Sequence, residues 1–237
     1  MTYASYTRDT KEPLKRIAHG RRFRQVVELI ASPLSSDTVL DYGCGDAHLF
    51  SLLQNKADRL VGYDPDPALL AQAANEVASA SELTTDIDAL KSRYMSKFSL
   101  IYCIEVCEHL TEAALDQLLD NLRTLAAPHA RVVFGVPIET GLPGFLKGMY
   151  RVTHDNRQFA SFGNSLKALF NIPIERRTTD VEWFGAHTGF RHRHFRQRIE
   201  AAGFKVRSTR CLPFPILGQL LNNEVYYVTR KSTKTAP

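Results

Sequence analysis

The chain has 237 residues, of which 44% are hydrophobic and 23% charged; these values fit one globular domain with a full core and exclude bulk disorder. It has no run of roughly 20 apolar residues that could span a bilayer, and its first residues lack the apolar core of a signal peptide. Much of the net charge of +5 comes from basic residues in 11–24 and 191–198, which indicate either an anionic partner or a solvated basic surface.

The four cysteines form no CxxC pair and no tight cluster with histidine. Two of them lie inside apolar runs, where a reduced thiol packs as a small hydrophobic group. We therefore expect a protein of the reducing cytoplasm.

Strands and helices alternate along the first half of the chain. Residues 11–31 have the apolar spacing of an amphipathic helix, with Pro33 beyond its end. Apolar runs then predict strands over 38–41, 59–63, 82–84, 98–104 and 130–136, and helices over 47–53, 67–79 and 111–126. This alternation predicts an α/β fold with a parallel sheet and helices on both faces.

The alternation stops between residues 138 and 190, where glycine, proline and aromatic residues are mixed with short helical pieces. About 50 residues are too many for a simple connection, so we interpret this segment as a substrate lid inserted between the fifth strand and the next helix. A helix over 192–202 and strands over 204–210 and 225–229 follow. We expect residues 1–237 to form a single domain.

A glycine-rich turn follows the first predicted strand, with Asp41, Gly43 and Gly45 in the string VLDYGCGD. Glycines allow the backbone to approach a ligand closely, and the helix that follows presents free N–H groups. A dinucleotide-binding fingerprint would have a third glycine at position 48, where this chain has His48. The turn therefore favours a ligand without a pyrophosphate.

Acidic residues follow the next three strands as well. Asp64 lies 19 residues beyond Gly45, where a carboxylate can accept hydrogen bonds from ribose hydroxyls. Asp86 follows the third strand, where an acid could hold an adenine amino group, and Glu105 follows the fourth.

In order and spacing, the segments VLDYGCGDAHLF, VGYDPDPALL, TTDIDAL, LIYCIEVCEHL and VVFGVPIETG resemble the motif set of class I S-adenosylmethionine (SAM)-dependent methyltransferases. The resemblance covers roughly residues 36–137, with similar closing strands after 203. It implies a Rossmann-like seven-stranded sheet with the last strand antiparallel, and SAM as cofactor. It also implies contacts to the methionine part of SAM from Asp41, Gly43 and Gly45, to the ribose from Asp64, to the adenine from Asp86 and Ile87, and to the cofactor side of the sheet from Glu105.

Methyl transfer to oxygen requires that the acceptor lose its proton, so we looked for a base that titrates near neutrality. His109 is the first candidate, because the loop after the fourth strand adjoins the transferable methyl group in this family. His187, His192 and His194 are further candidates. The alternatives are that His109 is a helix-entry residue bonded to the backbone, and that the other histidines bind anions or water.

The string Glu105-x-x-Glu108-His109 is similar to the ExxEH element with which ubiquinone-pathway and small-RNA 2′-O-methyltransferases hold a divalent cation. The same string occurs in relatives for which no metal is implied. A further ligand would have to come from His187, His192 or His194. We predict a site without metal, with this element as the alternative.

We expect methyl transfer to a small molecule, which the basic residues allow to be anionic, at a hydroxyl of a metabolite, sugar or lipid-linked compound. The alternatives are an RNA 2′-O-methyltransferase and an inactive SAM-binding interaction protein. Against RNA, the sequence shows no separate RNA-binding module and no aromatic residues interleaved with the basic runs. The apolar segment 142–150 either rests on a membrane surface or covers the acceptor, and the second role is preferred.

Overall fold

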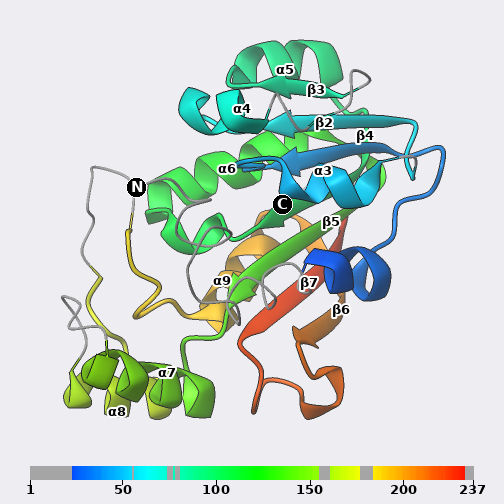
Figure 1. Ribbon diagram of the computed structural model, residues 1–237. Coiled ribbons are helices and arrows are strands. Elements are labelled where there is room, and N and C mark those ends of the chain that lie inside the picture. The colour runs from blue at the N-terminus through cyan, green and yellow to red at the C-terminus, as the bar shows by residue number, and fades with distance from the viewer. Residues whose placement is uncertain are drawn as a thin grey trace.

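The computed structural model describes residues 23–54, 56–73, 77, 81–154, 161–176 and 184–232. It is built on one seven-stranded sheet with the strand order β3-β2-β1-β4-β5-β7-β6 (Figure 1). The strands are β1 (Thr38–Tyr42), β2 (Arg59–Tyr63), β3 (Glu82–Thr84), β4 (Phe98–Ile104), β5 (Ala126–Pro137), β6 (Phe204–Leu212) and β7 (Glu224–Lys231).

Strands β1 to β5 are parallel, whereas β7 lies between β5 and β6 and is antiparallel to both. The predicted fold class is therefore confirmed, including the antiparallel last strand. The order of the sheet reverses between β1 and β4, and ligands of doubly wound sheets bind outside the carboxyl ends of the strands at such a point.

Helices cover both faces of the sheet (Figure 1). They are η1 (Val26–Ile30), α3 (His48–Leu53), α4 (Pro67–Ala73), α5 (Ile87–Tyr94), η2 (Cys107–His109), α6 (Glu112–Leu125), α7 (Gly141–His154), α8 (Phe162–Leu169), α9 (His192–Ala201) and η3 (Pro215–Leu217). The predicted N-terminal helix over 11–31 falls mostly outside the described residues. Helix α5 was not predicted.

Alternating side chains of the central strand β4 show how the two faces form. Ile101 and Cys103 belong to the core cluster beneath α5, α6 and α9, whereas Leu100, Tyr102 and Ile104 belong to the cluster beneath η1, α3 and α4. Successive residues of a strand point to opposite faces, so a continuous apolar run is needed where both faces are covered. This explains why β4 could be predicted from its sequence.

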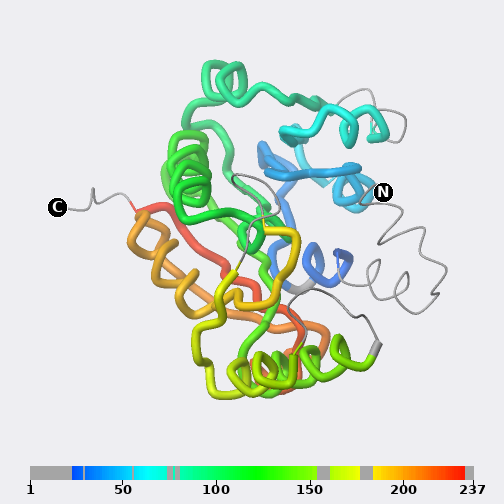
Figure 2. The backbone as a smooth tube through the Cα atoms, turned by 90° about the vertical axis from the view of Figure 1, so that its left-hand side faces the viewer, coloured from blue at the N-terminus to red at the C-terminus, as the bar shows by residue number. Residues whose placement is uncertain are grey.

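The segment between β5 and α9 contains the helical hairpin α7–α8, at the end of the molecule opposite α5 (Figures 1 and 2). Gly144 and Gly148 lie four residues apart on the inner side of α7. A Cβ at Gly148 would lie 2.4 Å from the Ser165 Oγ of α8, and one at Gly144 only 2.3 Å from the Glu139 carbonyl oxygen. The two glycines thus allow α7 to pack closely on its neighbours. Among the described helices, none is long and apolar enough to cross a membrane.

Candidate functional site

The glycine-rich turn after β1 is fastened to the end of β2. The N–H groups of Gly43 and Cys44 donate to the Tyr63 carbonyl oxygen at 2.7 and 3.0 Å. Gly43 has φ +80°, and a Cβ there would lie 2.3 Å from the Val106 Cγ2, so only glycine fits. Gly45 has φ +55°, but a Cβ at this position would meet no protein atom within 4 Å. The turn is therefore tight on its Gly43 side and open on its Gly45 side.

The Asp64 carboxylate, at the end of β2, is bonded to this turn. It accepts hydrogen bonds from the Gly45 N–H at 2.9 Å and from the Asp66 N–H at 2.9 Å, one on each oxygen. Burial raises the pKa of Asp64, and these two hydrogen bonds oppose the rise. A carboxylate offers about four lone-pair positions, so Asp64 keeps acceptor capacity for the hydroxyls of a ribose.

Three buried acids, Asp41, Asp46 and Asp64, lie together around the turn. Burial, followed by the charges of Asp64 and Asp46, raises the pKa of Asp41 to about 8. Because the neighbouring acids raise the pKa of Asp41, they repel a negative charge at that position, and a positively charged ligand would relieve this repulsion. SAM carries a sulfonium and an ammonium group, so the residues present fit the cofactor that the motifs imply.

Asp86 caps helix α5. Its Oδ1 accepts hydrogen bonds from the N–H groups of Asp88 and Ala89, both at 2.9 Å, as an N-cap residue does. Ile87, the first residue of α5, is half-buried and packs against the core. Capping gives Asp86 a structural role of its own, and its contact with adenine stays a prediction, as does that of Ile87.

Glu105 has an unusual backbone conformation for a residue with a side chain. It follows the last residue of β4 with φ +60°, and its N–H donates to the Gly135 carbonyl oxygen at 3.0 Å. Residues other than glycine are uncommon in this left-handed region, and such strain is concentrated at functional sites. The chain thus turns sharply at the carboxyl end of β4 and enters η2, which contains Glu108 and His109.

The two predicted catalytic histidines lie together, although 78 residues separate them in the chain. The Nε2 atoms of His109 and His187 are 3.1 Å apart, and His187 Nε2 is 3.9 Å from Glu108 Oε1. Donor atoms of Glu108, His109 and His187 all lie within 4.8 Å of one another. Glu108 is completely buried, and neither of its carboxylate oxygens has a hydrogen-bond partner among the described residues.

Burial sets the charge of this cluster. It lowers the pKa of His109. The hydrogen bond that His109 Nδ1 donates to the Phe184 carbonyl oxygen at 2.8 Å raises this pKa, but burial has the larger effect. Burial and the neighbouring His109 lower the pKa of His187 to about 3. The pKa of Glu108 rises through burial and the Glu105 charge. Both imidazoles are therefore neutral near pH 7, and because His109 Nδ1 carries the proton, its Nε2 carries the lone pair.

Arg176 holds the segment 184–190 over this cluster. Its guanidinium donates to the carbonyl oxygens of Glu108 and Ala186 and lies 4.0 Å above the centre of the Phe184 ring. Phe190 is buried and packs against Phe195, so its role is in the core. No pattern in the sequence singles out Arg176, which lies between Glu175 and Arg177 in an irregular segment.

The remaining candidate histidines lie elsewhere. His192 is buried at the start of α9, with Gln219 Oε1 3.3 Å from its Nε2. His194 is on the surface, 3.9 Å from Glu112 Oε1. The basic cluster of 191–198 is partly neutralised, since Arg198 forms ion pairs with acids of α6 and Arg196 pairs with Glu200.

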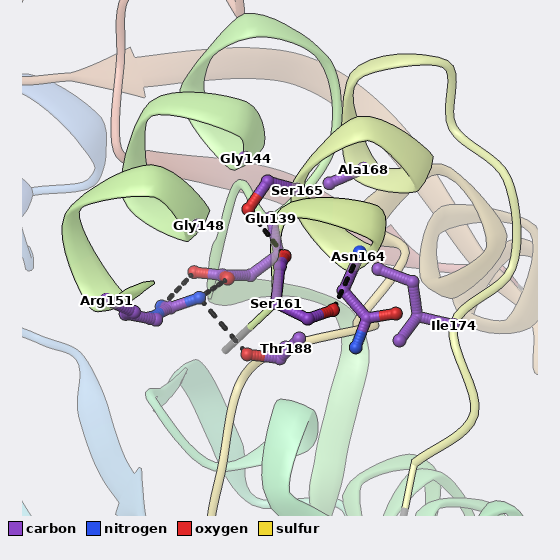
Figure 3. Close-up of a pocket in the computed structure, with 10 residues that line it drawn as sticks. All are labelled: Glu139, Gly144, Gly148, Arg151, Ser161, Asn164, Ser165, Ala168, Ile174 and Thr188. Atoms are coloured by element: carbon purple, nitrogen blue, oxygen red, sulfur yellow. Dashed lines mark hydrogen bonds and ion pairs between the residues drawn. The ribbon is translucent and has the colours of Figure 1, made fainter. Parts of the chain in front are cut away.

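A narrow hollow lies between α7, α8 and Thr188, with free space of about 10 Å³, room for one water molecule (Figure 3). Its buried acid is Glu139, which binds Arg151 Nη1 at 2.6 Å and Lys147 Nζ at 3.1 Å. Burial alone would raise the pKa of Glu139, but these two cations outweigh it and hold the pKa at about 2. Thr188, Ser161 and other lining residues supply hydroxyl and amide groups. The sequence analysis did not identify Glu139.

Comparisons with known proteins identify the family to which this fold belongs. A family described as "Methyltransferase domain" matches residues 14–209. A tRNA U34 carboxymethyltransferase of Shewanella sp. (strain W3-18-1) is 36% identical over 103 residues, which cover 39% of this chain and 30% of the relative. The chain thus matches less than a third of that relative's length.

Two solved structures show the same fold at low identity. Magnesium protoporphyrin IX methyltransferase from Synechocystis PCC 6803, with bound SAH, has a TM-score of 0.61 at 13% identity, covering 98% of this chain and 89% of its own. The 1,6-didemethyltoxoflavin-N1-methyltransferase of Burkholderia thailandensis has a TM-score of 0.59 at 14% identity, covering 97% and 85%. With the family match over most of its length, the chain belongs to the methyltransferase domain family and is a class I SAM-dependent methyltransferase.

Proposed function

We propose that this enzyme transfers the methyl group of SAM to a hydroxyl oxygen of a small-molecule acceptor, with His109 as general base. The observation that carries the proposal is the His109 ring, whose Nδ1 is bonded to the Phe184 carbonyl oxygen and whose Nε2 lone pair is turned toward His187. A lowered pKa keeps this ring unprotonated near pH 7, as a base must be.

SAM, when bound, supplies an activated methyl group, and the transfer is an in-line displacement that depends mainly on placement. The Gly43–Gly45 turn and the acids Asp41 and Asp64 bind and orient the cofactor in this proposal. An acceptor hydroxyl that replaces His187 as the partner of His109 Nε2 would transfer its proton to that nitrogen. Arg176 keeps the segment 184–190 in place above Glu108 and limits the access of water.

A second role for the histidines is favoured by one observation, the buried carboxylate of Glu108, to which none of the described residues donates a hydrogen bond. Glu108, His109 and His187 together offer a carboxylate and two imidazoles, a donor set suited to a divalent transition-metal cation. Such a cation would supply Lewis acidity that lowers the pKa of the acceptor hydroxyl.

A small molecule is the preferred class of acceptor. Some structural neighbours act on small molecules by name, as does the 1,6-didemethyltoxoflavin-N1-methyltransferase, whose structure holds 1,6-didemethyltoxoflavin. RNA is the second candidate, because the curated relatives are tRNA-modifying enzymes. The ion pairs of Arg196 and Arg198 remove part of the free positive charge that RNA would bind.

All four cysteines are free and buried, which supports a reducing, cytoplasmic location.

The test compares the variants His109→Gln, Glu108→Gln and, as a matched control, the surface variant His194→Gln. Transfer of labelled methyl from SAM is measured against a panel of hydroxylated metabolites, sugars and lipid-linked compounds, and against tRNA. His109→Gln should reduce the rate on the order of 10²-fold while SAH still stabilises the protein. A near-normal rate for His109→Gln would refute its role.

EDTA separates the two roles of His109. If His109 acts as a simple base, the rate of methyl transfer should be unchanged by EDTA and changed little by Glu108→Gln. If His109 binds a cation, EDTA should abolish methyl transfer and an added divalent cation should restore it. Retention of RNA that decreases steeply with salt, together with methylation of tRNA alone, would transfer the proposal to RNA.

A further inference from the structure

Large apolar side chains are exposed on one end of the molecule, which we call the apolar end. It consists of the hairpin α7–α8, the turn that follows α8 and the loop between β6 and β7, which lie at the same end in both views (Figures 1 and 2). Its exposed side chains are Leu146, Tyr150, Val152, Phe162, Leu166, Phe170, Ile172, Phe214, Ile216, Leu217, Leu220 and Leu221. Lys147 connects the two parts, since its Nζ donates to the Asn223 carbonyl oxygen at 3.1 Å.

The β6–β7 loop buries Asn222 and exposes its large apolar side chains, while its other polar side chains, Gln219 and Asn223, are half-buried and exposed. Asn222 is completely buried, accepts from the Phe214 N–H at 2.6 Å and donates to the carbonyl oxygens of Phe214 and Gly218. Ile216, at the tip, is 99% exposed. A loop that only had to remain in water would have the opposite arrangement. Its hydrogen bonds therefore hold the loop in a shape that presents apolar groups outward.

The hairpin presents its apolar residues in the same way. Gly144 and Gly148 occupy the inner side of α7, so Leu146 lies on the outer side. On α8, Ser165 and Ala168 are buried, whereas Phe162 and Leu166, one turn apart, are exposed. Phe170, just past the end of α8, is 67% exposed and extends the same stripe. Such a stripe is typical of a helix that lies in the interface of a membrane.

The charge of the apolar end identifies its partner. Lys147 and Arg151 share the single buried acid Glu139, so one positive charge of this group is not neutralised, and Lys167 adds a second. Lys167 lies exposed on α8, among the apolar side chains. Apolar groups that enter an acyl layer, with cations at their margin, complement a surface of anionic lipid headgroups. A second copy of this chain would bring like charges together.

We propose that the apolar end docks on the surface of an anionic lipid bilayer. The hairpin α7–α8 lies in the headgroup layer, and the β6–β7 loop inserts Ile216 and its apolar neighbours. The contact is peripheral, since none of the described helices is long enough to span a membrane. This surface is distinct from the cofactor site at the carboxyl ends of β1, β2 and β4.

The experiment measures binding of the full chain to sedimenting vesicles. One set of vesicles contains phosphatidylcholine with phosphatidylglycerol, and the other contains phosphatidylcholine alone. We expect binding to the anionic vesicles that weakens as salt is added. Ile216→Asp should lower the partition coefficient about tenfold or more, because the inserted group becomes charged. Lys167→Glu should lower it about fivefold or more on the anionic vesicles alone.

Met95→Asp is the matched control, because Met95 is 61% exposed beyond α5, at the opposite end of the molecule. It should bind like the unchanged protein, and Leu220→Ser replaces Ile216→Asp if that variant does not fold. Stabilisation by SAH, measured for every variant, reports that the fold is intact. Equal binding to both vesicle types, equal loss in Met95→Asp, or a dimer in light scattering that Ile216→Asp dissociates without any vesicle binding would overturn the proposal.

Discussion

Replacing Asp41 with asparagine should stabilise the ligand-free protein and weaken its hold on the cofactor. In the native protein, burial and the neighbouring acids raise the pKa of Asp41 from 3.8 to about 8. An acid whose pKa is raised by folding contributes stability that is fully present below its unfolded pKa and is lost as the pH rises through the folded pKa. At pH 7, about three pH units above the unfolded pKa of 3.8, Asp41 has lowered the free energy of unfolding by about 4 kcal/mol relative to acidic pH.

Urea unfolding at a series of pH values measures this effect. The free energy of unfolding should fall by about 1.4 kcal/mol per unit between pH 6.5 and 8 in the native protein. Asp41→Asn should remove about 1.4 kcal/mol per unit of this slope, whereas any slope of the same sign from Glu108, whose pKa burial also raises, should remain in both proteins. His187 does not affect this pH range. Its pKa is about 3 in the folded state and 6.5 in the unfolded state, so its contribution to the free energy of unfolding, which rises with pH, is confined to pH values below 6.5. A flat native profile over this window, or an Asp41→Asn protein less stable than the native one at pH 8, would refute the reasoning.

Three further predictions concern the glycine turn, the ribose acid and the buried acid of the hollow. Gly43→Ala should lose more stability than Gly45→Ala, because both have positive φ but only the first meets a side chain; thermal unfolding of the pair checks this. Asp64→Ala should abolish the rise in melting temperature that SAH causes, whereas the exposed Asp58→Ala should keep it. Glu139→Gln should lower the free energy of unfolding by about 3 kcal/mol, since it leaves two cations without their acid; an unchanged urea midpoint would contradict this.

The central strands β1, β2 and β4 could be predicted because each is an apolar run, buried on both faces of the sheet. The edge strands β3 and β6 are mostly half-buried or exposed, and their sequences give a weaker signal. Helix α5 was missed because its inward residues, Leu90 and Tyr94, are few and the rest of its surface is polar. Its strongest signal was the capping residue Asp86, which we had interpreted only as a ligand for adenine. The short side chain of an aspartate at the end of a parallel strand can either cap the next helix or bind a cofactor, and the sequence alone does not distinguish these two roles.

The cofactor side of the site follows from topology, since the carboxyl ends of β1, β2 and β4 meet at one edge. The grouping of Glu108, His109 and His187 does not. His187 was one of several candidates, and its contact with His109 spans 78 residues through an irregular segment with no periodic pattern. Only the packing of Arg176 on Phe184 and on the backbone of η2 shows which histidine approaches.

The hydrogen bonds between the glycine turn and β2 have a consequence for how this enzyme meets its cofactor. Backbone groups of Gly43, Cys44 and Gly45 are bonded to Tyr63 and Asp64 of the protein itself. Hydrogen bonds within the fold therefore order this turn, and the entropy of ordering it is lost during folding. A ligand at this turn meets a backbone that is already in place, so little of its binding free energy is needed to order the turn.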